Sequence, residues 1–280
     1  MDRREQNRMI FEDTRERCSE GVLKKSIGNS CKEQRVIKEN DDVPSATIRK
    51  DYGKTKVIVS DKRSFEAAKE YNGKKVCVLN FASASNPGGG VVHGSNAQEE
   101  SLCRCSTLYF CLNVKPNWDA FYAPHRALQN PLYNNDCIYT PNITVFKSDV
   151  AIPELLPESE WYSVNVLSAA APNLRERPSN AMNPCAGKKR VVLKDSELLE
   201  LHLSRGRRIL DVAKDKGNEV LILGAFGCGA FQNPPHVVAE AYKRLMGEYD
   251  GVFELVEFAV YCPPRDSSNY DVFARVLRGM

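Results

Sequence analysis

The sequence predicts an α/β protein in which a β-sheet lies between layers of helices. The first observation is a strand, a helix and a strand in succession at 57–60, 64–74 and 76–82, with Gly73 ending the helix. The second is that later apolar runs of strand length alternate with helical patterns. The expected strands are 142–146, 162–171, 219–226 and 253–262, and the expected helices are 196–216, 235–248 and 270–277. Such alternation is typical of a sheet layered between helices.

The 280-residue chain is organised as one domain with an N-terminal extension. Residues 1–50 are polar and carry dense charge of both signs, with a helix expected at 6–18 and a loop-rich stretch through Gly28, Asn29 and Pro44. We expect this segment to be an accessory extension and residues 51–280 to form the functional domain. Its sequence contains no internal repeat, low-complexity tract or glycine-serine linker.

Composition is that of a globular protein without helical membrane spans. Hydrophobic residues make up 42% of the chain and charged residues 27%, and the apolar stretches are far shorter than the roughly 18 residues of a membrane helix. The first residues lack the apolar block of a secretory signal, which favours the cytoplasm and free thiols for the ten cysteines. The net charge of +3 does not indicate direct nucleic-acid binding, although it does not oppose an anionic ligand.

The first candidate binding segment follows the second expected strand and contains three consecutive glycines, 88–90. Consecutive glycines leave main-chain amides accessible to a ligand, although flexible turns use the same residue type. Downstream, Ser95 with Gln98 and Asn96 with Glu99 both have capping-box spacing, so a helix is expected to begin here. The loop therefore leads to a helix N-terminus, whose free amides suit an anionic or polyhydroxylated ligand.

The second candidate segment, 221–235, runs from an apolar strand through Gly224, Gly227 and Gly229 to two prolines that precede a helix. Main-chain amides in such a strand, loop and helix can cradle phosphates. The glycine spacing does not match the dinucleotide-binding fingerprint, and the first loop lacks the lysine of a Walker loop. Because both loops follow strands of one sheet, we expect them to meet in a crevice at its carboxyl edge, one holding a diphosphate and the other a ribose.

Two adjacent acids, Glu99 and Glu100, fall in the first turn of the helix after the first loop. An acidic pair in that place usually faces water and favours the helix dipole. Here the neighbouring glycine loops favour a chemical role. Neighbours on a helix point about 100° apart, so one carboxylate can hold sugar hydroxyls while the other faces the bond to be broken. Glycosidic cleavage needs a carboxylic acid to protonate the departing oxygen, and the same group can then activate water.

Together these segments resemble the signature of the poly(ADP-ribose) glycohydrolases. The signature is GGG at 88–90, a seven-residue spacer VVHGSNA, and QEE at 98–100. The stretch 80–109 is similar to the shorter bacterial-type branch of the family. GAFGCGAFQNPP at 224–235 resembles the second substrate loop of the family, and SAAAPN at 168–173 is similar to another family segment. The resemblance covers most of the chain from about Lys56 onward.

The resemblance implies a macrodomain-like three-layer α/β/α sandwich around a mixed sheet, with an N-terminal, mainly helical extension. It also implies cleavage of the ribose–ribose O-glycosidic bonds of poly(ADP-ribose), with release of ADP-ribose. By position, Glu100 matches the catalytic acid/base and Glu99 its partner that binds ribose hydroxyls. The implied binding residues are Asn86, Gly88, Gly89 and Gly90 at the distal ribose, Gln98 at the loop or substrate, Gly227, Cys228, Gly229 and Ala230 at the diphosphate, and Phe231 against the sugar.

Two other functions remain open on the sequence: a non-catalytic reader of ADP-ribose, and a hydrolase that removes mono-ADP-ribose from a protein or nucleic acid. The implied partners are poly(ADP-ribose), ADP-ribose and the ADP-ribosylated proteins that carry the polymer. No cofactor is expected, because a carboxylic acid and a water suffice for this bond. Cys103, Cys105 and Cys111 lack zinc-site spacing, so no metal is expected either.

Overall fold

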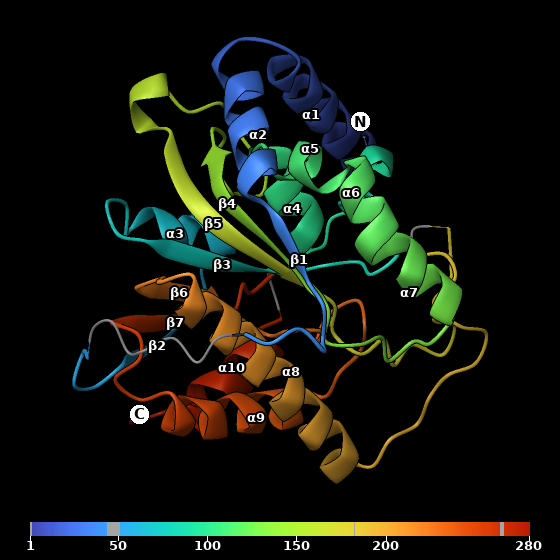
Figure 1. Ribbon diagram of the computed structural model, residues 1–280, viewed down its shortest axis with the longest axis vertical. Helices are drawn as coiled ribbons and strands as arrows, with labels where there is room; N and C mark the ends of the chain where they lie inside the picture. The colour runs from blue at the N-terminus through green and yellow to red at the C-terminus, as the bar shows by residue number, and fades with distance from the viewer. Residues whose placement is uncertain (1, 44–50, 182, 264–265) are drawn as a thin grey trace.

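The computed structural model describes residues 2–43, 51–181, 183–263 and 266–280, and a mixed seven-stranded sheet lies at its centre (Figure 1). The strand order is β1-β4-β5-β3-β6-β7-β2. β4 runs antiparallel to both of its neighbours, and the strands from β5 to β2 are parallel to one another. The strands are β1 (Arg35–Ile37), β2 (Lys56–Ser60), β3 (Val76–Phe81), β4 (Cys137–Val145), β5 (Tyr162–Ala169), β6 (Val220–Leu223) and β7 (Leu255–Ala259).

Helices cover both faces of the sheet, which confirms the predicted fold class (Figure 1). The α-helices are α1 (Arg3–Cys18), α2 (Gly21–Glu33), α3 (Ser64–Lys69), α4 (Gln98–Cys105), α5 (Leu108–Leu112), α6 (Lys115–Asn117), α7 (Ala123–Leu128), α8 (Asp195–Asp215), α9 (Pro235–Glu248) and α10 (Ser268–Val276). Short 3-10 helices lie at Val91–His93 and Glu158–Glu160, and a π-helical turn lies at Trp118–Tyr122. Among the described residues, no helix is long and apolar enough to cross a membrane.

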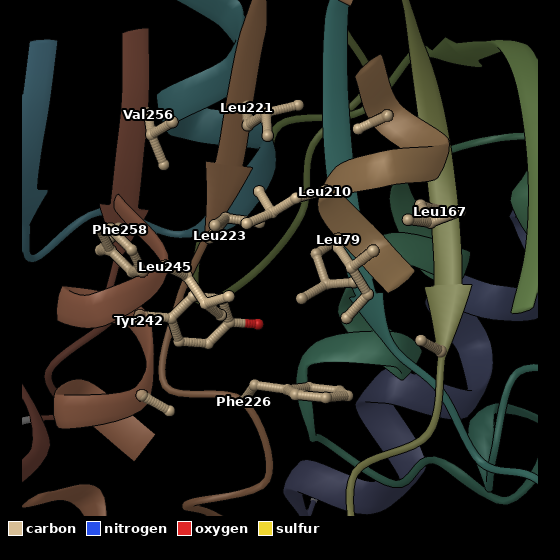
Figure 2. Close-up of a cluster of buried hydrophobic side chains, with 14 of the residues drawn as sticks. Leu79, Leu167, Leu210, Leu221, Leu223, Phe226, Tyr242, Leu245, Val256 and Phe258 are labelled. Carbon is tan, nitrogen blue, oxygen red and sulfur yellow. The ribbon is translucent and has the colours of Figure 1, made fainter. Parts of the chain in front are cut away.

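Side-chain alternation along the central strands produces the three layers. Leu79 on β3 and Leu221 on β6 belong to the core under α8, α9 and α10, where Figure 2 shows them with Tyr242 of α9. The intervening residues, such as Val78, belong to a second core under α3, α4 and α5. Successive side chains of a strand point to opposite faces, so strands that are apolar throughout can fill both cores. The sheet therefore supplies a rigid frame whose carboxyl edge carries the loops.

The N-terminal helices pack against this frame. The Phe11 ring of α1 is fully buried, with its centroid 5.0 Å from that of Tyr109 in an edge-to-face arrangement. Lys147, only 3% exposed, donates hydrogen bonds to the carbonyl oxygen of Ile10 at 2.9 Å and to Thr14 Oγ1 at 2.6 Å. β1 extends the sheet by antiparallel pairing with β4. The accessory role expected for residues 1–50 stays a prediction, while the described part of the segment packs on the main core.

Several expected elements differ from the structure. The loop predicted through Gly28 and Asn29 is wrong, because both residues lie in α2, while Pro44 lies outside the described residues. α2 has few buried apolar residues and is fixed by polar contacts to β4, such as the one between Ser26 Oγ and Thr144 Oγ1 at 2.7 Å. Sequence periodicity does not detect contacts of this kind.

Two elements also begin or end at other residues than predicted. The helix expected at 64–74 ends at Lys69, and Gly73 instead occupies a following turn with a φ of 97°. The strand expected at 142–146 begins at Cys137. A bulge between Thr140 and Ile143 interrupts the regular alternation of β4, which is why its first half does not stand out in the sequence.

Candidate active site

The two glycine loops follow β3 and β6, which are neighbours in the sheet, and they meet over one cavity of about 460 Å³. This meeting confirms the expected crevice at the carboxyl edge of the parallel strands. The volume lies in the range of small-molecule sites. Of the predicted site residues, those that line the cavity are Gly89, Gln98, Glu99, Glu100, Gly227, Gly229, Ala230 and Phe231. The other predicted residues, Asn86, Gly88, Gly90 and Cys228, lie in the same loops but are not part of the lining.

The glycines of the first loop allow the main chain to lie directly on α4. Gly88 and Gly89 have positive φ values of 67° and 57°, a region that glycine adopts without strain. A Cβ atom on Gly89 would lie 2.5 Å from Glu100 Oε1, and one on Gly88 would lie 2.7 Å from the Tyr109 ring. Because neither position has room for a side chain, the glycines bring the loop against the acidic pair.

Glu100 joins the loop to the start of α4. Its Oε1 accepts a hydrogen bond from the main-chain N–H of Gly90, and its Oε2 accepts one from that of Ala97, both at 2.9 Å. The side chain is 7% exposed and lines the cavity. Two main-chain donors therefore fix the carboxyl group in a single orientation at the cavity wall.

The helix start differs from the predicted capping boxes. α4 begins at Gln98, and the acid that reaches back to the N-cap main chain is Glu100, one residue beyond the expected pairs. Ser95 and Asn96 instead accept hydrogen bonds from Arg104, through a main-chain and a side-chain oxygen at 2.6 and 2.9 Å. Arg104 is 1% exposed, so a buried guanidinium holds the segment that leads into the helix. Spacing alone does not distinguish these overlapping caps.

Glu99 is buried more deeply than its neighbour, at 3% exposure. Its Oε2 accepts from the main-chain N–H of Ser83 at 2.8 Å, and its Oε1 accepts from Asn80 Nδ2 at 3.3 Å. Burial and the adjacent Glu100 carboxylate together raise the pKa of Glu99 to about 8. The acidic pair therefore retains a proton at neutral pH.

Gln98 braces the end of β3. Its Oε1 accepts from the main-chain N–H of Phe81 at 2.9 Å, while its Nε2 donates to the carbonyl oxygen of Leu79 at 2.8 Å and to Ser64 Oγ at 3.0 Å. The amide thus ties β3, α3 and α4 together. The glutamine of the signature, Gln98, therefore has a structural role: it holds the end of β3 against the first turn of α4.

The second loop is shaped by Asn233, which the sequence did not single out. The main-chain N–H and the Nδ2 of Asn233 both donate to the carbonyl oxygen of Gly227, at 3.0 and 3.1 Å. Gly227 has a φ of 80°, and a Cβ there would lie 2.6 Å from Asn233 Nδ2. Burial lowers the pKa of His202 to about 4, so this neutral ring donates from Nε2 to Asn233 Oδ1 at 2.9 Å. The loop is therefore a fixed turn, and its residues Gly227, Gly229 and Ala230 line the cavity.

Other residues that line the cavity come from segments in which the sequence shows no motif. Asn183, 5% exposed, accepts hydrogen bonds from the hydroxyls of Ser83 at 3.1 Å and Ser85 at 2.6 Å, and it donates to Tyr133 Oη at 2.8 Å. Asn183 lies between β5 and α8 in a stretch without regular secondary structure, so no periodicity could have indicated it. It connects that stretch to the first glycine loop.

Three further residues of the cavity lining, Arg63, Asp149 and Tyr261, have charged or aromatic side chains. The guanidinium carbon of Arg63 lies 3.9 Å from the centroid of the Tyr261 ring, and both residues line the cavity. Asp149 also lines it, and its oxygens accept from Ser101 Oγ at 2.7 Å and from the main-chain N–H of Phe65 at 3.0 Å. Burial raises the pKa of Asp149. These groups add charged and aromatic side chains to the lining of the cavity.

No group of three or more histidine, cysteine or acidic side chains within the described ranges is arranged to hold a metal ion. The ten cysteines are free thiols, and Cys103, Cys105 and Cys111 are buried. Burial raises the pKa of Cys103 well above its usual value. The carboxyl-bearing residues that line the cavity are Glu99, Glu100 and Asp149.

The chain is similar to one family of known proteins. The family model described as microbial-type PARG, catalytic domain, matches residues 8–148, where PARG stands for poly(ADP-ribose) glycohydrolase. A search of curated proteins finds no match. Among solved structures, the PARG from Thermomonospora curvata is 31% identical, with a TM-score of 0.81 over 98% of this chain and 100% of that chain.

Two ligand-bound structures are also similar. The T. curvata enzyme bound to the inhibitor ADP-HPD is 31% identical, with a TM-score of 0.79 over 97% of this chain and 99% of that chain. The PARG from Deinococcus radiodurans in complex with ADP-ribose is 32% identical, with a TM-score of 0.76 over 90% of this chain and 96% of that chain. The family match, the similarity to these structures over nearly the full length and the glutamate pair between two glycine loops lead to one conclusion. The chain belongs to the microbial-type poly(ADP-ribose) glycohydrolases.

Proposed function

We propose that this protein hydrolyses the ribose–ribose O-glycosidic bonds of poly(ADP-ribose) with Glu100 as the general acid and base. The observation that supports this role most strongly is the fixed orientation of the Glu100 carboxyl group at the cavity wall, with main-chain donors at both oxygens. A carboxyl group held in this way can act on a bond placed in the cavity without first losing rotational freedom.

The reaction follows from these positions. The proton that the acidic pair retains passes from Glu100 to the oxygen that links the two riboses, and that oxygen leaves with the bonding electrons as the anomeric carbon gains oxocarbenium character. The resulting Glu100 carboxylate then accepts a proton from a water molecule, whose oxygen bonds to the anomeric carbon. The products are ADP-ribose and a shortened polymer that ends in a hydroxyl, and Glu100 has regained its proton.

The other site residues bind the substrate. Glu99, with its raised pKa, is assigned to the ribose hydroxyls. Asn86, with Gly88, Gly89 and Gly90, is assigned to the distal ribose. The main-chain amides of the second loop, at Gly227, Cys228, Gly229 and Ala230, are assigned to the diphosphate, and Phe231 to the sugar. The fixed turn at Gly227 supports the diphosphate assignment, because amides that are already oriented bind an anion at little entropic cost.

Poly(ADP-ribose) and the ADP-ribosylated proteins that carry it are the expected partners of this site. We propose that the reaction takes place in the cytoplasm, where cysteines such as the ten free thiols of this chain stay reduced. The reaction needs a carboxylic acid and a water molecule, and we assign it no metal and no cofactor.

Product analysis tests the proposed function against its two alternatives. The wild-type protein is incubated with poly(ADP-ribose) and, separately, with a mono-ADP-ribosylated protein, and free ADP-ribose is measured by chromatography. We expect ADP-ribose from the polymer. Binding of ADP-ribose without release from either substrate would instead identify a non-catalytic reader. Faster release from the mono-ADP-ribosylated protein would identify a hydrolase of the single protein linkage.

A further inference from the structure

The near end of the first glycine loop is held by an arginine from a distant element. Arg126 lies on α7, and its Nε donates to the carbonyl oxygen of Ser85 at 2.7 Å. Its Nη2 donates to the side-chain oxygen of Asn86. One guanidinium thus fixes both the main chain and a side chain directly before the glycines. Glu100 holds the other end of the loop through Gly90.

Arg126 is itself held in place by an aromatic ring. Its guanidinium carbon lies 4.7 Å from the centroid of the Trp118 ring. Trp118 Nε1 donates to Asn113 Oδ1 at 2.8 Å, and the indole lies 5.3 Å from the ring of the fully buried Tyr122. A cation over an indole face is attracted by the ring electrons. The ring therefore limits the guanidinium to the position from which it reaches the loop.

The loop between these anchors needs external contacts because its glycines have little preference for one conformation. Gly88 and Gly89 both have positive φ values, and glycine loses more conformational freedom on ordering than any other residue. The anchor at Asn86 lies next to these glycines, so a change there alters the course of the main chain toward the cavity.

We propose that Arg126 is a positioning residue for the distal ribose. It fixes the Asn86 side chain and the first turn of the loop in the geometry that receives the sugar. This inference rests on the proposed function, which assigns Asn86 to the distal ribose. Lysine can replace arginine only in part here, because the planar guanidinium holds its donors in a fixed arrangement on separate nitrogens, whereas the three donors of an ammonium group share one nitrogen.

The test compares Arg126→Met with Arg126→Lys and a matched control. Loss of a charged hydrogen bond at a ligand-binding residue is expected to raise the KM for poly(ADP-ribose), and the Kd for ADP-ribose, by about tenfold to a hundredfold. The kcat should change much less, because the lost contact orders the ground state and the transition state alike. Arg126→Lys should recover part of the affinity. Arg244→Met is the control, because Arg244 pairs on the surface with Glu240 of its own helix, and its KM should equal that of the wild type.

A double-mutant cycle separates positioning from general loss of structure. Asn86→Ala should also raise KM, and the double variant should lose less than the sum of the two single losses, because either substitution breaks the contact between Arg126 and Asn86. Additive losses would overturn the inference, as would a wild-type KM in Arg126→Met. A lowered kcat with unchanged KM would also overturn it, since that pattern indicates a smaller folded fraction.

Two further measurements keep the test decisive. If Arg126→Met does not fold, Arg126→Lys and Trp118→Leu take its place, and both should raise the KM to a smaller extent. Calorimetric titration with ADP-ribose measures the Kd without turnover. A wild-type protein that binds ADP-ribose but releases none from the polymer would therefore refute the proposed function and still leave the role of Arg126 to be decided by the Kd values.

Discussion

Gly89→Ala is the perturbation that most sharply tests how the first loop holds the carboxyl group of Glu100. The added Cβ would lie 2.5 Å from Glu100 Oε1, so the carboxyl group or the loop must move by about 1 Å to restore an ordinary contact. A displacement of about 1 Å in a catalytic group can cost about a hundredfold in rate. The alanine must also adopt a φ of 57°, which costs about 1–2 kcal/mol of folding free energy.

Gly217→Ala separates these two effects. Gly217 has a nearly equal φ of 66°, but a Cβ there would contact only the Lys75 Nζ, at 3.7 Å. Gly217→Ala should lose about 1–2 kcal/mol in free energy of unfolding, measured by chemical denaturation, and Gly89→Ala should lose about 1–3 kcal/mol more because of the steric overlap. At saturating polymer, Gly89→Ala should release ADP-ribose about a hundred times more slowly than the wild type, whereas Gly217→Ala should match it. Equal rates in the two variants would refute the reasoning.

Three further predictions concern pH, the buried amide and the N-terminal helix. Because the folded pKa of Glu99 is about 8, against about 4.3 for an unperturbed glutamate, the folded state keeps a proton that the unfolded state loses. The contribution of Glu99 to stability is full below pH 4 and is lost as the pH rises through 8, so Glu99→Gln should flatten the fall in unfolding free energy measured between pH 5 and 8. Asn183→Ala should cost about 1–3 kcal/mol in denaturation experiments, because it removes a buried amide that bridges two segments. The exposed Asn72→Ala should cost less than about 0.5 kcal/mol, and equal losses would contradict the bridging role of Asn183. Phe11→Ala should lower the free energy of unfolding by about 3–5 kcal/mol, because the ring is fully buried. Met9, half exposed on the same helix, is the control, and Met9→Ala should cost less than about 0.5 kcal/mol. A similarly small loss in Phe11→Ala would mean that α1 does not share the main core.

The fold class and the catalytic segment were predictable because both are local in the sequence. The strands that form the parallel part of the sheet are continuous apolar runs, such as 220–223, and the helices between them have clear periodicity. The glycine loop and the glutamate pair lie within 13 residues of one another, so their proximity follows from the chain itself. The observed N-cap of α4 differs from the predicted one only because several residues in that segment can cap a helix.

The parts that were not predicted depend on contacts between distant segments. α2 is held by polar contacts to β4, more than a hundred residues away. Asn183 reaches the first loop from an irregular stretch, and Asn233 shapes the second loop through its side-chain amide. A single asparagine carries no signal of such a role in the sequence. Phe121 and Tyr122 are fully buried in the core and do not line the cavity.

The central claim is that Glu100 delivers a proton to the bond between two riboses. Glu100→Gln keeps the shape of the side chain and removes the acid, so it addresses this step alone. We expect the variant to bind ADP-ribose in calorimetric titration and to release ADP-ribose from poly(ADP-ribose) about 10²–10⁴ times more slowly than the wild type under single-turnover conditions. Release at the wild-type rate by a variant that binds ADP-ribose normally would contradict the account.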